Sequence, residues 1–567
     1  MTSPNRRTSR TSRAPHSSLA ALVAVTLSLA LAACVGIPSS GSVMTGNEVT
    51  EDETFPFAAL PSGPQADSTQ QEILTDFMQA ATSPGNDYEI ARQFLTSQAD
   101  AGWKPGASVL IREGSGTTLG ITETTVEYSV STKASVDSFG LYKEDRVQAT
   151  QRRQYSFEQV DGQWRISALD DGTVLSRDNF EAAFDEHALY FFDPSFRYLI
   201  PDVRWFPTRS DVPTRIVNAL VGGQASWMQG GATLTAFPQG TRVSRVEVVS
   251  GRATVDLSDE AAGLSNLEKA RVQQQLETSL GTVSVNTVSL TVRGVPLAVP
   301  DAGASNATVT PPVDSEALIR RGDEFGFATA NTFASINNLS SKIVEVDASA
   351  VTLARGQTSA AVLGVAGAYL ITVGDQEPIL VDDRPGLVAP SIDTWKYVWS
   401  VPADNAAALR AIGSDQVVHE ISSTLPVDAE VVSFEVSRDG ARVLLYLNTD
   451  TGPKLFVAAV LRRDGVPSGL GELIGLPVSA DAPIDASWVD DRSVATLATT
   501  DGHQVVTLFQ IGGPTESLGR ADGGVALVGG NGTEQIRVLT DNGTILQRRA
   551  SGWQNALLTA DVLATQQ

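Results

Sequence analysis

The sequence predicts a multidomain protein of mixed class, in which two α+β regions precede an all-β region. Three observations lead to this prediction. In residues 68–185, apolar residues first recur at helical spacing and then alternate as in strands. In residues 191–300, strand and helix patterns follow one another in the order β-α-β-β-α-β. In residues 325–567, short apolar runs alternate with Gly-containing turns, and helical spacing is nearly absent.

The first 33 residues have the pattern of an export signal. Residues 1–18 hold four arginines and no acidic residue, and residues 19–31 consist almost wholly of Ala, Leu and Val. This apolar run is shorter than the roughly 20 residues that a membrane-spanning helix needs. We therefore predict a signal peptide over residues 1–33 and not a permanent spanning anchor.

Cys34 is the one cysteine of the chain, and it follows Leu31, Ala32 and Ala33. This tetrapeptide resembles the lipobox of bacterial lipoproteins, in which the thiol is alkylated with diacylglycerol and the signal is then cut away. The resemblance implies covalent diacylglycerol and an acyl chain such as palmitate on Cys34, and we expect no other cofactor. The alternative is a plain secretory signal that leaves Cys34 without a role. No disulfide can form within a chain that has one cysteine.

Acidic residues outnumber basic residues by 65 to 41. Removal of residues 1–33 takes away four arginines and no acid, which leaves 37 basic against 65 acidic residues and a charge of −28. Such a charge repels nucleic acid and anionic lipid headgroups. We therefore expect no nucleic-acid partner, and we expect the lipid to hold the protein at the membrane without help from a basic patch.

Residues 34–67 are rich in Gly, Pro, Ser, Thr and acids without an apolar period, which predicts a flexible stalk. In residues 68–185, the helix pattern is carried by Ile73, Leu74, Phe77, Met78 and Ala81, and the strand pattern by Val126, Tyr128, Val130, Tyr155 and Phe157. Two helices on a curved antiparallel sheet resemble the cone-shaped fold of nuclear transport factor two. The segment from Asp161 to Ile166, DGQWRI, is similar to the last hairpin of many such domains.

The second α+β unit is predicted over residues 191–300. Its helices are indicated by Ile216, Val217 and Leu220, and by Val272, Leu276 and Leu280 after a capping box of Ser265 and Glu268. The segment from Phe237 to Thr241, the hairpin that follows it and the segment from Ala253 to Ser258 together resemble the GerMN domain of sporulation and cell-envelope proteins. That resemblance implies interaction and no known chemistry.

Trp227 and Met228 follow Gly222-Gly223 in a loop of this unit. Large apolar side chains in such a loop either anchor a protein partner or pack into the core of their own chain. Both interpretations stay open from the sequence.

Residues 301–324 are predicted as a linker, and residues 325–567 as a β-propeller. The segment from Val436 to Val443, VSRDGARV, is similar to the turn of TolB-like propeller blades, and Trp399-Ser400 and Ser487-Trp488 resemble blade starts. At about 40–45 residues per four-stranded blade, this region holds five or six blades. Two stacked sandwiches are the alternative.

No catalytic set and no metal site emerges from the sequence. The four histidines are scattered, and His419-Glu420 begins like a zinc-protease motif but has Ser423 where the second histidine is required. The chain has neither a Gly-x-Ser-x-Gly elbow nor a phosphate-binding loop. We therefore expect a protein that is not an enzyme.

The order of lipobox, cone-shaped unit, GerMN domain and propeller resembles the LpqB family of actinobacterial envelope lipoproteins. The resemblance implies a protein on the extracytoplasmic face of the cell membrane. It also implies a partner, the extracellular domain of the sensor histidine kinase of the Mtr two-component system, which affects cell-envelope and division processes. The alternative function is a lipoprotein that binds a cell-wall glycan or peptide.

Overall fold

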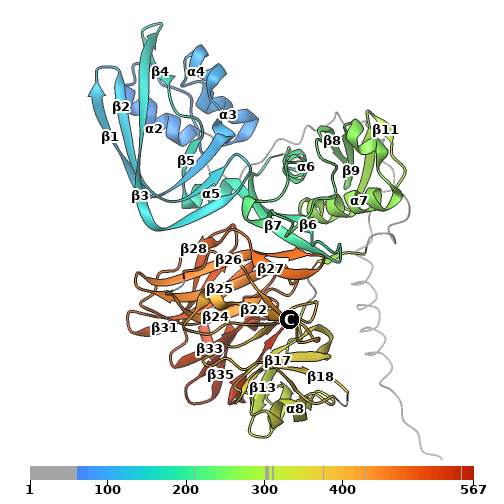
Figure 1. Cartoon of the computed structure of the whole chain (residues 1–567). Coiled ribbons are helices and arrows are strands. Elements are labelled where there is room, and N and C mark those ends of the chain that lie inside the picture. Colours follow the sequence, from blue (N-terminus) through green and yellow to red (C-terminus); the bar gives the residue numbers. More distant parts are fainter. Residues whose placement is uncertain are drawn as a thin grey trace, which may run out of the picture. The chain divides into compact units, whose positions relative to one another are not determined.

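The computed structural model describes residues 61–209, 211–299, 306–309, 312–374, 376–426, 428–550 and 552–567. The described residues form two α+β regions followed by a β-propeller (Figure 1), which confirms the predicted fold class. The predicted signal peptide lies outside the described residues, as does the predicted stalk up to residue 60.

The N-terminal region places helices on one face of a five-stranded sheet (Figure 1). Its elements are α2 (Gln70–Ala80), α3 (Gly85–Arg92), α4 (Ser97–Gly102), β1 (Ser108–Thr122), β2 (Thr125–Asp137), β3 (Tyr142–Val160), β4 (Gln163–Ala168), β5 (Thr173–Ser176) and α5 (Arg177–Ala183). The strand order is β4-β3-β2-β1-β5, antiparallel except for the parallel pair of β1 and β5.

The amphipathic patterns account for this packing. Ile73, Leu74 and Phe77 of α2 are buried in one cluster with Tyr128 and Tyr155 of the sheet. Thr69 begins α2 with a capping box: the Thr69 hydroxyl accepts from the amide of Glu72, and the Glu72 carboxylate accepts from the amide of Thr69.

The second α+β region contains two sheets and two long helices. Its elements are β6 (Phe184–Phe192), β7 (Tyr198–Pro207), α6 (Val212–Gly222), the 3-10 turn η2 (Ser226–Met228), β8 (Val243–Val249), β9 (Arg252–Leu257), α7 (Asn266–Leu280), β10 (Thr287–Val292), β11 (Val295–Pro296) and β12 (Thr308–Val309). One sheet has the order β11-β10-β9-β8 and the other the order β12-β7-β6. The predicted stripe of α7 is buried against the first sheet.

Strand β6 covers residues 184–192 and pairs along its whole length with β7. It therefore spans the gap between the two predicted units, of which the first ends at residue 185 and the second begins at residue 191. Every residue of β7 is buried, so this strand has no alternating pattern. The hairpin of β6 and β7 contributes Phe184 and Trp205 to a cluster with the N-terminal sheet, and Leu189 and Phe191 to the core around α6 and α7.

The C-terminal region consists of six sheets in the described residues. The first contains β13 (Ala317–Arg321), β14 (Glu324–Ala328), β15 (Phe333–Ser335) and β37 (Val562–Leu563); the second contains β16 (Ala350–Leu353), β17 (Ser359–Gly364), β18 (Gly367–Thr372), β19 (Ile379–Asp382) and β38 (Thr565–Gln566). The third contains β20 (Ser391–Ile392), β21 (Val398–Ser400), β22 (Arg410–Ile412) and β23 (Val418–Glu420); the fourth contains β24 (Glu430–Val436), β25 (Arg442–Thr449), β26 (Gly452–Arg463), β27 (Val466–Leu470) and β28 (Ile474–Leu476). The fifth contains β29 (Ala482–Trp488), β30 (Ser493–Thr500), β31 (His503–Gln510) and β32 (Thr515–Arg520); the sixth contains β33 (Gly524–Val528), β34 (Arg537–Thr540), β35 (Thr544–Arg549) and β36 (Gly552–Thr559). One short helix, α8 (Ser340–Glu345), lies between the first two sheets in sequence.

The predicted linker over 301–324 overlaps structured residues. β13 lies within it and pairs with both β14 and β37, so that the first blade starts at residue 317. The run from Ala317 to Ile319 is apolar and buried, but three residues are too few to show a strand period in the sequence.

Candidate functional site

The predicted lipidation site, Cys34, and its lipobox residues Leu31, Ala32 and Ala33 lie outside the described residues. Among the residues that the structure describes, no helix is both long and apolar enough to cross a membrane. The candidate sites described below all lie within the residues that the structure describes.

Trp227 and Met228 lie in η2, in the loop after α6, and both are buried. They share an apolar cluster with Leu444 and Tyr446 of β25 and Val457 of β26. The side chains that the sequence offered as partner anchors are therefore covered by the propeller of the same chain, which is the second of the two interpretations given above.

Polar contacts reinforce this shared core. The Trp205 indole donates to the Gly512 carbonyl at 2.8 Å, and the Arg492 guanidinium donates to the Glu186 carboxylate at 2.9 Å. In the hairpin itself, Asp202 pairs with Arg204 at 2.7 Å, and both side chains are buried. Asp202 also accepts from the amide of residue 225 at 2.8 Å, which fixes the loop that holds Trp227.

The turn that resembles TolB-like blades connects β24 and β25 of the fourth sheet, and its side chains contact the fifth sheet. Asp439 accepts from the Ser437 hydroxyl at 2.6 Å and pairs with Arg442, whose side chain is 1% exposed. The Arg442 guanidinium donates to the Asp491 carbonyl at 2.8 Å and lies 4.9 Å from the ring centre of Trp488 in the next blade. The buried pair is thus hydrogen-bonded across the blade boundary, as a buried charge requires.

The centre of the propeller contains a cavity of about 240 Å³ between its inner strands, and it is lined by the buried Glu435 and the half-buried Asp485. Glu435 accepts from the amide of Trp488 at 2.9 Å and from the hydroxyls of Ser487 and Thr565. Burial raises the pKa of Glu435 to about 8. Burial also raises the pKa of Asp485, which accepts from the Ser433 hydroxyl at 2.7 Å.

The described residues contain no group of three or more His, Cys, Asp or Glu side chains that could hold a metal ion. His419 and Glu420 lie on strand β23, so the partial zinc-protease motif has no helix to act from. His187 is buried, and burial lowers its pKa. These residues therefore offer no metal centre.

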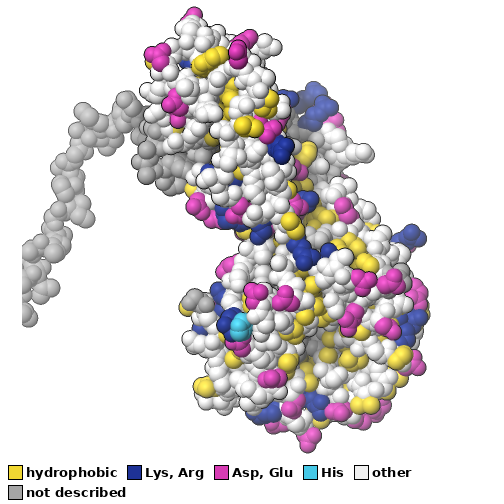
Figure 2. All heavy atoms as spheres, turned by 90° about the vertical axis from the view of Figure 1, so that its left-hand side faces the viewer, with side chains coloured by type: hydrophobic (Ala, Val, Ile, Leu, Met, Phe, Trp, Pro, Cys, Tyr) yellow, Lys and Arg dark blue, Asp and Glu magenta, His cyan; other side chains and the backbone are white. Residues whose placement is uncertain are grey.

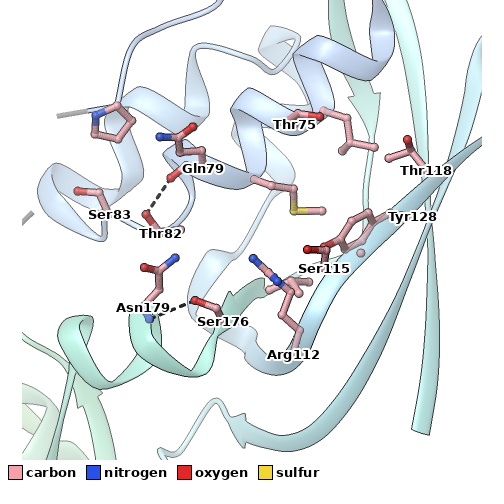
Figure 3. A pocket seen from close by; sticks show the side chains of 15 residues that line it. Thr75, Gln79, Thr82, Ser83, Arg112, Ser115, Thr118, Tyr128, Ser176 and Asn179 are labelled. Atoms are coloured by element: carbon pink, nitrogen blue, oxygen red, sulfur yellow. Dashed lines mark hydrogen bonds between the residues drawn. The ribbon is translucent and has the colours of Figure 1, made fainter. Parts of the chain in front are cut away.

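The N-terminal region contains a pocket of about 610 Å³ between α2, the strands β1, β2 and β5, and α5 (Figure 3). Its apolar part consists of Pro61, Leu74, Met78 and Val174. Neutral polar side chains form most of the remaining lining: Thr75, Gln79, Thr82, Ser83, Ser115, Thr118, Tyr128, Ser176 and Asn179. This volume is in the range of sites for small molecules.

Arg112 of β1 is the one charged side chain among the described residues that line the pocket. Figure 3 shows this side chain reaching into the middle of the pocket, between the α2 and α5 residues on one side and Tyr128 on the other. Its guanidinium donates to the Gly114 carbonyl. Burial raises the pKa of Tyr128, and the positive charge of Arg112 opposes that rise.

Sequence reasoning did not identify this pocket. Its available signal was the segment Gly114-Ser115-Gly116, which interrupts the alternation of β1 and forms an irregularity in its pairing with β2. A Cβ atom at position 116 would lie 2.2 Å from the Tyr128 ring, so glycine allows the ring to lie against the strand.

Three family models match the chain. The model of the N-terminal domain of lipoprotein LpqB matches residues 63–181, a model described as "Sporulation and spore germination" matches residues 188–298, and the model of the lipoprotein LpqB beta-propeller domain matches residues 329–562. Together they follow the order of the three folded regions.

Two relatives called lipoprotein LpqB show how far the similarity extends. The chain is 25% identical to the Cutibacterium acnes protein, over 94% of this chain and 97% of that protein. It is 26% identical to the Bifidobacterium longum protein over 72% of this chain, which spans 63% of that relative. The chain is also similar to the first GerMN domain of the sporulation protein GerM from Bacillus subtilis, with 21% identity, a TM-score of 0.18, and coverage of 20% of this chain and 86% of that one.

Proposed function

Because the chain belongs to the LpqB family of lipoproteins, we propose that it is a lipid-anchored interaction protein at the extracytoplasmic face of the cell membrane. In this proposal, Cys34 carries diacylglycerol and an acyl chain, and residues 35–67 act as the stalk. The folded part acts without catalysis of its own on the extracellular domain of the sensor histidine kinase of the Mtr system. The kinase partner comes from the family resemblance.

The shared core of the second region and the propeller carries this proposal. Trp227 and Met228 are buried against β25 and β26, and Trp205 donates across the same junction. Apolar and polar contacts of this kind bring residues of two domains together, which suits recognition of one protein partner. A lipid tether adds to this by confining both proteins to one bilayer, which raises their effective concentration without new contacts.

The anchor is tested by the variant Cys34→Ala in cells fed with labelled palmitate. We expect the label to be absent from the variant, because alanine has no sulfur to which the lipid can be attached. We also expect the variant to leave the membrane fraction, because the acyl chains are what anchors the protein there. The variant Ser42→Ala, eight residues further on, is the matched control and should stay labelled. Label on the Cys34→Ala variant would contradict the proposed lipidation.

The partner is tested by pulldown with the purified Cys34→Ala variant as the immobilised protein. We expect it to retain the extracellular domain of the sensor kinase and not purified cell wall. Retention of wall fragments alone would favour the alternative function, a lipoprotein that binds a wall glycan or peptide. The pocket of about 610 Å³ in the N-terminal region is the observation that favours this alternative.

A further inference from the structure

The pocket of the N-terminal region is positively charged, whereas the chain as a whole is acidic. The chain has 24 more acidic than basic residues, and Figure 2 shows acidic side chains spread over the face that it displays. Yet the part of the lining that the structure describes contains no acidic side chain and one basic side chain, that of Arg112. A cation in an acidic protein usually has a carboxylate nearby, so the surroundings of Arg112 decide what the pocket is suited to bind.

Arg112 has no carboxylate within 4 Å among the described residues, although Glu113 follows it directly in the sequence. Successive side chains of a strand point to opposite faces, so Glu113 lies on the other side of β1. There it pairs with Arg177 at 3.2 Å, and Arg177 has a second carboxylate, that of Glu144, at 3.7 Å. Arg177 is thus paired with two carboxylates, whereas the guanidinium of Arg112 keeps N–H donors for a ligand.

The rest of the lining indicates the remainder of that ligand. Hydroxyl and amide groups from α2, β1 and α5 surround the guanidinium, and each can both donate and accept hydrogen bonds. The Tyr128 ring offers a flat apolar face beside them (Figure 3). Such a lining suits a molecule with several hydroxyl groups, one apolar ring face and one negative charge.

We propose that this pocket binds a small sugar derivative that carries one anionic group, a carboxylate or a phosphate, with Arg112 as the anion-binding residue. The proposal goes beyond the interaction role, because it requires neither the kinase nor the lipid anchor. Its failure would leave the pulldown with the sensor domain unaffected, and failure of that pulldown would leave the pocket unaffected.

The test is calorimetric titration of the full-length protein in detergent with four probes: D-glucuronate, N-acetylglucosamine 1-phosphate, uncharged N-acetylglucosamine and inorganic phosphate. We expect one of the two anionic sugars to bind about tenfold or more tightly than the uncharged sugar, since hydrogen bonds to charged groups contribute more than neutral ones. Which of the two binds distinguishes a carboxylate ligand from a phosphate ligand. Inorganic phosphate should bind more weakly than the anionic sugar that binds, because phosphate lacks the sugar hydroxyl groups.

Variants locate the binding. Arg112→Gln should lower the affinity for the anionic sugar about 10- to 100-fold, to that of the uncharged sugar, and Arg112→Lys should restore part of it. Thr75→Trp, at an exposed position of α2, should block the pocket without disturbing the core. Arg146→Gln, an exposed arginine of β3 outside the pocket, is the matched control and should bind as the unmodified chain does.

Three results would overturn the proposal. They are equal affinity for charged and uncharged sugars, unchanged binding after Arg112→Gln, and no binding of any of the four probes. Inorganic phosphate that binds as tightly as the sugar phosphate would refute the recognition of hydroxyl groups.

Discussion

Glu435 is the residue whose environment departs most from that of an ordinary glutamate. Its carboxylate lines the central cavity of the propeller and accepts hydrogen bonds from three groups, and it forms no salt bridge within 4 Å among the described residues, although the charge of Arg438 interacts with it from farther away. Burial is the largest cause of its raised pKa, and the nearby Asp485 adds to it. A carboxyl in this position takes up a proton more readily in the folded chain than in the unfolded chain.

This difference predicts a pH dependence of stability. The unfolded chain loses the Glu435 proton near pH 4.5, and the folded chain loses it near pH 8. The stability from this proton is therefore fully present below pH 4.5 and is lost as the pH rises to about 8, which amounts to a few kcal/mol. We expect Glu435→Gln to flatten the fall in melting temperature between pH 5 and pH 8.

The matched control is Glu430→Gln, at an exposed position of the same strand, which should leave the pH profile as it is. Asp485 keeps its own raised pKa in both variants, so a smaller slope should remain. An unchanged slope in Glu435→Gln would refute the assignment. Melting curves by calorimetry over this pH range supply the measurement.

At the scale of elements, the apolar side chains of η2, in the loop after α6, pack against the propeller. Trp227 is 9% exposed and packs in the cluster that includes Leu444 and Val457. Replacement of a buried Trp by Ala costs about 3–5 kcal/mol, because apolar contact is lost and a cavity stays behind. We expect Trp227→Ala to destabilise the junction and to speed amide hydrogen exchange in η2 and β25, measured by mass spectrometry.

Val249→Ala serves as the control for this prediction. Val249 belongs to the same region but is 62% exposed, so its replacement should alter stability by no more than about 0.5 kcal/mol. Equal hydrogen exchange at the junction in both variants would show that Trp227 does not hold it together.

The elements also differ in how well the sequence predicts them. Asp464-Gly465 and Asp501-Gly502 both have positive φ at both residues, as two-residue hairpin turns require, and they are among the Gly-containing turn signals of residues 325–567. Strand β7 lies inside the second predicted unit, but β6 crosses the gap between the two units, because its buried residues do not alternate regularly with exposed ones. Arg112 could not be recognised as a pocket residue from the sequence. The sequence does not show which face of β1 the helices cover, and therefore does not show that the Glu113 carboxylate points away from Arg112.

At the scale of the whole molecule, the ring of blades is closed by residues from both ends of the propeller. β37, at residues 562–563, completes the first sheet by pairing with β13, and β38 pairs in parallel with β16 of the second sheet. Residue 564, which lies between β37 and β38, donates its amide to the Leu318 carbonyl of β13 at 2.9 Å. The first blade is therefore completed by a contact between residues about 240 positions apart, which carries a high loop-closure cost.

Removal of residues 562–567 should open this ring. The deletion takes away the buried side chains of Val562 and Leu563, whose burial contributes about 1.5–3 kcal/mol each, together with the backbone pairing of two blades. Loss of β37 also leaves β13 as an open edge next to the central cavity, where unpaired amides are exposed to other chains. We expect the deletion to lower the melting temperature of the propeller and to expose its first two blades to limited proteolysis.

Leu557→Ala is the matched control, because Leu557 lies in the last blade near the same end of the chain and is 77% exposed. A second variant, Leu563→Asp, keeps the chain length and places a charge in the buried closure, so it should reproduce the effect of the deletion. Proteolytic fragments that begin within β13 to β19 in both closure variants, and not in Leu557→Ala, would locate the opening at the first two blades. Identical melting and cleavage in all three variants would mean that the remaining strands hold the ring closed without β37 and β38.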